Sequence, residues 1–100
     1  SLLALERIEQ ANRRFGIGAK PGSFAENLTV AGVRLDILRL GARICVGSTL
    51  LEVVQIGKVP HLAHTYHFQG FSISPIWGVF CRVVEGGEIV RGDEVQISQL

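Results

Sequence analysis

The chain has 100 residues, enough for one domain with a single modest core. Apolar residues make up 47% of it and charged residues 19%, a composition that folds rather than stays disordered. The formal net charge is +1, from ten basic and nine acidic residues. Nucleic-acid binding normally shows as a clear basic excess, so we expect no nucleic-acid partner.

Neither the apolar runs nor the cysteines indicate a membrane or secreted protein. No apolar stretch approaches the roughly 18 residues needed to span a bilayer. The first charged residue is Glu6, and the uncharged run before it is too short for the apolar part of a signal peptide. Cys45 and Cys81 make neither a disulfide framework nor a zinc knuckle. We therefore expect a cytoplasmic protein with no membrane contact.

The first predicted element is an amphipathic helix over about residues 3–14. Apolar side chains recur at helical spacing from Leu2 to Phe15, and Gly16 follows as a C-terminal stop. Because the chain opens almost directly on this helix, we expect no strand before it.

After the helix the hydrophobic period changes to that of β-strands. Short alternating runs are separated by glycines typical of turns. These runs lie at 27–30, 42–47, 49–56, 78–84 and 94–97. They predict a mainly β fold over residues 1–100, a small partial or closed β-barrel with one N-terminal helix.

With no strand before the helix, the sheet would keep an open edge, and an upstream strand, a partner or a swapped segment would have to cover that edge. We therefore expect a homo-oligomer or a marginally soluble chain.

The charge-poor segment 53–81 is the first candidate for a binding site. Lys58 is its one fixed charge, and it holds all three histidines and five of the seven aromatic residues. A mostly apolar concavity with a few polar groups is the usual composition of a small-molecule site. Composition alone favours the alternative, a well-buried part of the core. If the segment is a pocket, its candidate lining residues are His64, Tyr66, His67 and Trp77.

The histidines follow an H-x-x-H-x-x-H spacing that does not suit one metal ion. In a strand, His61 and His67 would point one way and His64 the other. On a helix the three would spread over about a third of the circumference. Zinc usually takes a fuller ligand set at tighter spacing. We therefore expect no metal site, and histidines that line a pocket or are partly buried.

Glu26 and Asn27 form a second candidate, where a loop enters a strand. Their side chains either cap backbone amides or face a ligand, and capping is favoured on chemistry alone. Cys45 and Cys81 have no flanking base or helix N-terminus to activate them, so we expect core or near-core packing for both.

Three blocks together resemble the MOSC domain, the module found at the carboxy terminus of molybdenum-cofactor sulfurases and also as a stand-alone protein. The blocks read PGSFAENLTVAGVRL, RLGARICVGSTLLEVVQIGK and GVFCRVVEGGEIVRGDEVQI, and the resemblance covers essentially all of the chain in order. It implies a MOSC-like β-barrel that handles the molybdenum cofactor or sulfur destined for it. It also implies a pterin-type ligand, and a cysteine desulfurase or a molybdoenzyme as partner. Family members carry a strand-forming segment before the stretch that matches SLLALE, and we expect this chain to lack it.

The departures from the family pattern concern its thiol chemistry. Where stand-alone members have two cysteines and an arginine, this chain has Pro60, His64 and Ile76, and only Lys58 and His61 remain of that set. A thiolate can accept and pass on sulfane sulfur as a persulfide, and proline cannot. The resemblance therefore implies a MOSC domain without its sulfur-carrying thiol.

Three functional hypotheses remain open. In the first, the domain binds the molybdenum cofactor or another phosphate-bearing ligand, with Lys58 and His61 contacting the phosphate and aromatic residues packing against the ring. In the second, it is a sulfur carrier or sulfurtransferase that uses Cys81 or Cys45. In the third, it is a degenerate, non-catalytic remnant.

Overall fold

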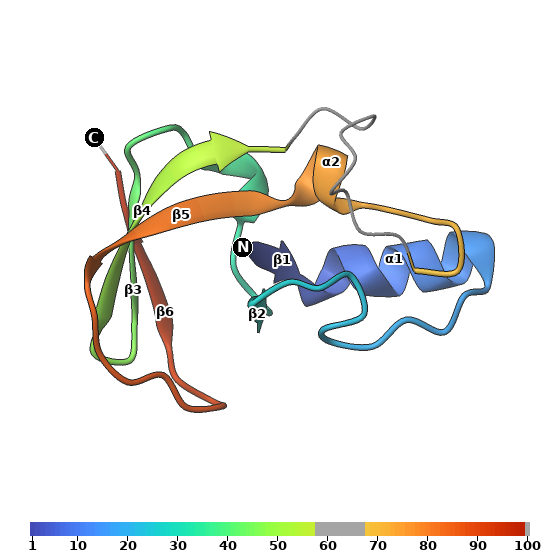
Figure 1. The fold of residues 1–100 in the computed structure, drawn as a ribbon, viewed down its shortest axis with the longest axis horizontal. Helices are drawn as coiled ribbons and strands as arrows, with labels where there is room; N and C mark the ends of the chain where they lie inside the picture. Colours follow the sequence, from blue (N-terminus) through green and yellow to red (C-terminus); the bar gives the residue numbers. More distant parts are fainter. Residues whose placement is uncertain (58–67, 100) are drawn as a thin grey trace.

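The computed structural model describes residues 1–57 and 68–99 (Figure 1). Its elements in chain order are β1 (Leu2–Ala4), α1 (Leu5–Phe15), β2 (Leu28–Val30), the 3₁₀ helix η1 (Leu35–Ile37), β3 (Arg43–Val46), β4 (Thr49–Ile56), α2 (Ser74–Trp77), β5 (Val79–Glu85) and β6 (Val95–Ser98). The predicted mainly β fold with one main helix is confirmed, and each of the five predicted strands is present. Among the described residues, no helix combines the length and the apolar character needed to cross a bilayer.

The strands form one curled sheet in the order β2-β1-β5-β4-β3-β6. β1 runs parallel to β2, and the other neighbouring pairs are antiparallel. The register of β4 against β5 shifts at two places, between Leu50 and Leu51 and between Val53 and Gln55. Such bulges bend a strand and increase its twist, which suits the curled shape in Figure 1. The result is a half-barrel whose edge strands, β2 and β6, are not paired with one another in the described part of the chain.

The expectation that no strand precedes the helix was wrong. Residues Leu2–Ala4 form β1, which lies inside the sheet between β2 and β5. Leu2 packs into the apolar cluster beneath the sheet and Leu3 into a second cluster beneath α1, and both are almost fully buried. Because both faces of this short strand are apolar and it runs directly into α1, its residues merge with the helical pattern and show no strand alternation.

The main helix ends as predicted. The backbone of Gly16 is left-handed, with φ 64°, and its N–H donates to the carbonyl of Asn12 at 2.8 Å. A glycine adopts this conformation without steric cost, which makes it a common helix stop. The Asn12 side chain then holds the departing loop through two hydrogen bonds to the backbone of Ala19.

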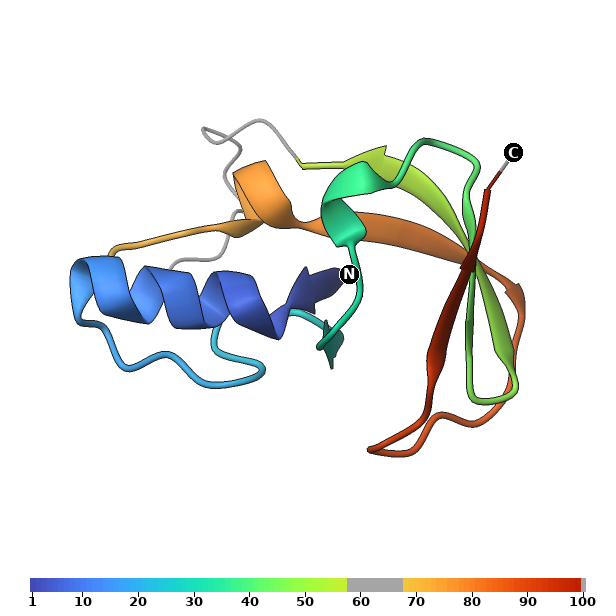
Figure 2. The ribbon, with the colours of Figure 1, turned by 180° about the vertical axis from the view of Figure 1, so that it is seen from behind.

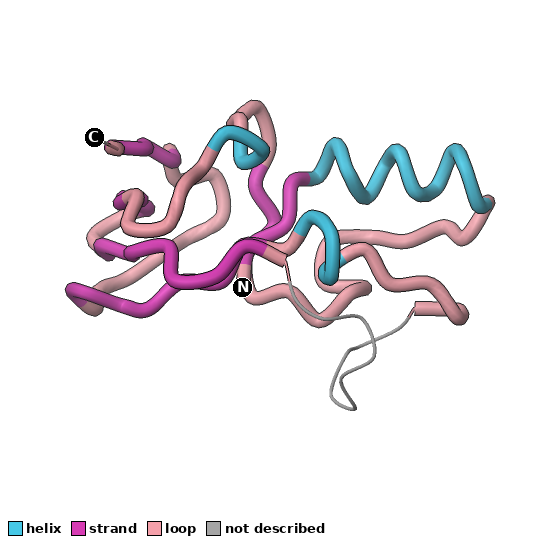
Figure 3. Tube along the Cα trace, turned by 90° about the horizontal axis from the view of Figure 1, so that it is seen from above, coloured by secondary structure: helices cyan, strands magenta, loops and turns pink. Residues whose placement is uncertain are grey.

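Two apolar clusters lie on either side of the short strand β1. The sheet core consists of Leu2, Ala4, Val30, Leu35, Leu38, Ala42, Ile44, Val46, Leu51, Val53 and Val79. The helical core consists of Leu3, Ile8, Ala11, Ile17, Ala19, Phe24 and Ile73. Figures 2 and 3 show the backbone from behind and from above, with α1 extending away from the longer strands. The half of the molecule around the sheet core and the half around the helical core meet where β1 passes into α1 and where α2 leads into β5.

Candidate ligand-binding site

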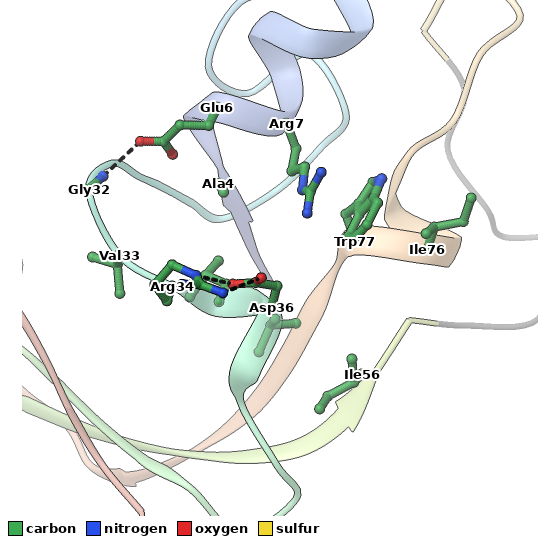
Figure 4. A pocket seen from close by; sticks show the side chains of 12 residues that line it. Ala4, Glu6, Arg7, Gly32, Val33, Arg34, Asp36, Ile56, Ile76 and Trp77 are labelled. Atoms are coloured by element: carbon green, nitrogen blue, oxygen red, sulfur yellow. Dashed lines mark hydrogen bonds and ion pairs between the residues drawn. The ribbon is translucent and has the colours of Figure 1, made fainter.

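A hollow of about 600 Å³ lies at this junction of the two halves (Figure 4). We call it the α1–α2 hollow. Its walls are Ala4, Glu6, Arg7, residues 32–36, Ile56, Ile76, Trp77 and Val79. The volume falls within the range usual for small-molecule sites, and apolar walls with a few charged groups are their common composition.

Arg7 presents a positive charge in this hollow. Its guanidinium carbon lies 3.5 Å from the centroid of the Trp77 ring, a close cation–π stack. One guanidinium nitrogen, Nη1, donates to Oε1 of Gln10 at 3.0 Å. Among the described residues, no carboxylate forms an ion pair with Arg7. The stack therefore holds the guanidinium in place without a carboxylate in direct ion-pair contact among the described residues.

The second arginine of the hollow, Arg34, is neutralised by Asp36. Its Nε and Nη2 donate to the two carboxylate oxygens of Asp36, at 2.8 and 3.0 Å. These hydrogen bonds hold the pKa of the Asp36 carboxyl below its ordinary value, and the nearby charge of Arg7 acts in the same direction. The same contact raises the pKa of Arg34. Asp36 is therefore a fixed anion near neutral pH, with the planar two-point geometry that guanidinium and carboxylate groups favour.

Glu6 ties the start of α1 to the loop that carries Arg34. Its Oε2 accepts the backbone N–H of Gly32 at 2.8 Å, and this hydrogen bond is the main reason why the pKa of Glu6 is lowered. The backbone of Gly32 is left-handed, with φ 71°, a conformation that suits glycine. Figure 4 shows this contact on one side of the hollow and the Arg7–Trp77 stack on the other.

Trp77 is the one predicted pocket residue that the structure places in the α1–α2 hollow. The predicted contacts Lys58 and His61, and the predicted pocket residues His64, Tyr66 and His67, lie outside the described residues. β4 brings the chain to the hollow through Ile56. The next residue, Gly57, donates its N–H to the carbonyl of Gly78 at 2.7 Å, which fixes the end of the strand beside the start of β5.

The structure places the Glu26 carboxylate within its own loop. The side chain is buried, and it accepts the N–H groups of Gly22 and Phe24 and the hydroxyl of Thr29. This is the capping arrangement that the chemistry favoured. Asn27 is exposed, and its backbone N–H donates to the carbonyl of Ser1.

Glu26 and Asn27 line a different space from Trp77. It is a hollow of about 850 Å³ between β2 with its flanking loops and residues 89–95, and we call it the seam hollow. The structure therefore does not bring the two candidate groups of the sequence together. A ligand contact by Glu26 or Asn27 stays a prediction.

The two cysteines are both free, and they differ in burial. Cys45 is exposed, so the expectation of core packing was wrong for it: β3 alternates, and Ile44 and Val46 take the two inward positions on either side. Cys81 is half-buried against the sheet core, as expected, and burial raises the pKa of its thiol. Neither side chain lines the α1–α2 hollow.

Sequence reasoning missed Arg7, Arg34 and Asp36. Arg7 lies among the charged residues of an amphipathic helix, where the pattern indicates only a solvated face. Arg34 is near the end of the first MOSC-like block and Asp36 directly follows that block, and this position is the one sequence signal that could have pointed to them. Within the described ranges, no group of three or more His, Cys, Asp or Glu side chains could hold a metal ion.

Comparison with known proteins identifies the family. The chain matches the MOSC domain over residues 1–96, and it belongs to the MOSC domain family. A similar solved structure is the crystal structure of YiiM from Geobacillus stearothermophilus, with 24% sequence identity and a TM-score of 0.76. The similarity covers 98% of this chain and 53% of the YiiM chain, so this chain spans about half the length of that protein. This similarity shows that the chain and YiiM share a fold. No curated protein matches the chain.

Proposed function

We propose that the α1–α2 hollow binds the molybdenum cofactor or a related phosphate-bearing, pterin-like ligand, and that the domain does so without carrying sulfur. The MOSC domain family is associated with this cofactor, which makes it the first ligand to consider. The observation that carries the proposal is the guanidinium of Arg7, stacked on Trp77 in a hollow of suitable size and with no carboxylate in ion-pair contact among the described residues.

Arg7 would contact the phosphate. A guanidinium offers several N–H donors in a rigid plane and pairs well with phosphate oxygens. One Arg7 nitrogen donates to Gln10, which leaves donors on the other nitrogens for a ligand. Lys58 and His61 follow Ile56 closely in the sequence, and we expect Lys58 to add positive charge for the same phosphate and His61 to add to it when protonated.

The flat ring of the ligand would lie against the apolar part of the hollow. Ile56, Ile76 and Val79 line it, and Ile56 and Ile76 are 45% and 66% exposed. Such large apolar side chains lose unfavourable water contact when a ring covers them. The bound cofactor would supply the redox chemistry of its molybdenum, and the residues of this chain would bind and orient it.

Sulfur transfer has less support than binding. The family's thiol position is Pro60 in this sequence. A half-buried thiol with a raised pKa, as at Cys81, forms little of the reactive thiolate near neutral pH. The exposed Cys45 lies on β3, outside the hollow.

Trp77 is the one tryptophan of the chain, so its fluorescence reports on this hollow. A titration with inorganic phosphate should give a saturable change in that fluorescence. Mass spectrometry of protein purified under native conditions should find a co-purifying phosphorylated pterin. Protein without a bound pterin, together with fluorescence that phosphate does not change, would refute the proposal and favour a degenerate remnant.

A further inference from the structure

The edge strand β6 lacks the features that normally block pairing with another chain. It is paired with β3 on one side, and no strand of the described chain pairs with its other side. Proteins often protect such an edge with a proline, a charged side chain or a bulge. β6 reads VQIS, which contains neither a proline nor a charge, and its register against β3 has no shift. The outer backbone N–H and C=O groups of β6 can therefore pair with a further strand.

The alternation along β6 suits pairing with a second copy of the same strand. Val95 and Ile97 are half-buried and pack against the sheet core, whereas Gln96 and Ser98 are exposed. When two copies of β6 run antiparallel about a twofold axis at Gln96, each Val95 lies opposite Ile97 of the second copy. Apolar side chains then face apolar ones, and polar side chains face polar ones, which is the arrangement that stabilises a sheet.

The exposed face of the sheet carries an excess of positive charge next to β6. Arg43, Glu52 and Arg82 lie opposite one another on β3, β4 and β5 and form one row. Glu52 contacts Arg82 at 2.8 Å and Arg43 at 3.4 Å, so one carboxylate serves two guanidinium groups, and Arg43 has the looser contact. Ser98 continues this row onto β6 with a small side chain. An acidic side chain just beyond Ser98 would complete the charge pairing of Arg43.

We propose that two copies of this chain pair antiparallel through β6, with the twofold axis at Gln96, and that Glu94 of each copy faces Arg43 of the other. Glu94 is exposed and directly precedes β6. In this register it lies opposite Ser98 of the second copy, at the end of the row that contains Arg43. The two sheets join into one, and the charge contact occurs twice because of the symmetry. This interaction surface is separate from the α1–α2 hollow, which β6 does not line.

A disulfide cross-link tests the register directly. Opposite residues of an antiparallel pair have Cβ atoms about 4.5–5.5 Å apart, so a disulfide bond needs only a small adjustment. Gln96→Cys in a Cys45→Ser background should therefore form a covalent dimer under mild oxidation, seen by non-reducing electrophoresis. Cys45 must be replaced because it lies opposite position 96 on β3 and would capture the new thiol. Val54→Cys, at an exposed position of the interior strand β4, is the matched control and should form no dimer.

A charge reversal tests the contact between Glu94 and Arg43. Glu94→Lys brings a lysine toward Arg43 of the second copy, and by symmetry this repulsion occurs twice. One exposed charge pair changes an equilibrium by up to about fivefold, so two should weaken self-association about tenfold, measured by sedimentation velocity. Glu9→Lys makes the same change of charge at an exposed position of α1 and should leave self-association unchanged.

Three results would contradict the proposal. A parent protein that is monomeric at every concentration has no such interface. If the parent self-associates but Gln96→Cys cross-links no better than Val54→Cys, the copies meet elsewhere on the molecule. Equal effects of Glu94→Lys and Glu9→Lys would overturn the assigned contact between Glu94 and Arg43.

Discussion

The α1–α2 hollow and the seam hollow differ in what their charged groups contact. The seam hollow is the larger, at about 850 Å³ against about 600 Å³, but two of the three acids that line it, Glu26 and Asp93, are used within their own loops. Glu26 accepts three hydrogen bonds from its own segment, and Asp93 accepts the N–H of Val90. In the α1–α2 hollow, Arg7 is stacked on an aromatic ring and has no carboxylate in ion-pair contact among the described residues. Size alone therefore does not identify the binding site; the partners of each charged group do.

The largest effect expected from this comparison is a loss of protein stability when the Glu26 carboxylate is removed. Glu26→Ala removes the acceptor for two backbone N–H groups and one hydroxyl, and it should lower the free energy of unfolding by about 3 kcal/mol. Urea denaturation followed by circular dichroism measures this directly. Glu9→Ala, at an exposed position, should change stability by less than about 0.5 kcal/mol. Equal, small losses for both variants would mean that Glu26 does not organise its loop.

A second prediction concerns the edges beside the seam hollow. β2 and β6 present edges of the sheet, and exposed edges promote pairing between copies of a chain. We expect concentration-dependent self-association, measured by sedimentation velocity. Val90→Lys, a charge in the wall of the seam hollow, should weaken it about tenfold, which corresponds to about 1.4 kcal/mol.

Val83→Lys provides the control for that experiment. Val83 is about as exposed as Val90, at 62% against 55%, but it does not line the seam hollow. It should leave self-association unchanged. A monomer at every concentration, or equal effects of the two lysines, would show that the seam is not where copies meet.

The smallest expected effect on phosphate binding is that of removing the two thiols. Replacing Cys45 and Cys81 together with serine should leave phosphate binding nearly intact, because neither side chain lines the α1–α2 hollow. Serine at position 81 should cost some stability because Cys81 packs against the sheet core. A sulfur-transfer activity that the parent protein shows and the double variant lacks would replace the binding function with that of a sulfur carrier.

Strands such as β3 could be predicted because their burial alternates along the chain. In β3, exposed Arg43 and Cys45 alternate with buried Ile44 and Val46, which is the pattern that sequence reasoning detects. β1 could not be predicted, because Leu2 and Leu3 are buried on opposite faces by two different cores. Three consecutive apolar residues show no hydrophobic periodicity that would distinguish a strand from a helix.

The candidate site could be predicted only where composition indicates it. Trp77 was found because aromatic residues gather in a charge-poor segment. The role of Arg7 depends on a contact with Trp77, seventy positions away in the sequence, and no local pattern contains it. Arg34 and Asp36 are also ordinary surface residues by type, and their place in the hollow follows from the way Glu6 holds the loop at Gly32.

Phosphate binding by Arg7→Ala tests the central claim most directly. Phosphorus NMR titrations with inorganic phosphate should show affinity about tenfold to a hundredfold weaker than in the parent, the loss expected for one charge-assisted contact. The unfolding free energy should stay within about 1 kcal/mol, because a surface arginine contributes little beyond its stacking on Trp77. Arg13→Ala, which removes the same charge from an exposed position of α1, should change neither quantity. Phosphate affinity that is equal in the parent and in Arg7→Ala would contradict the account.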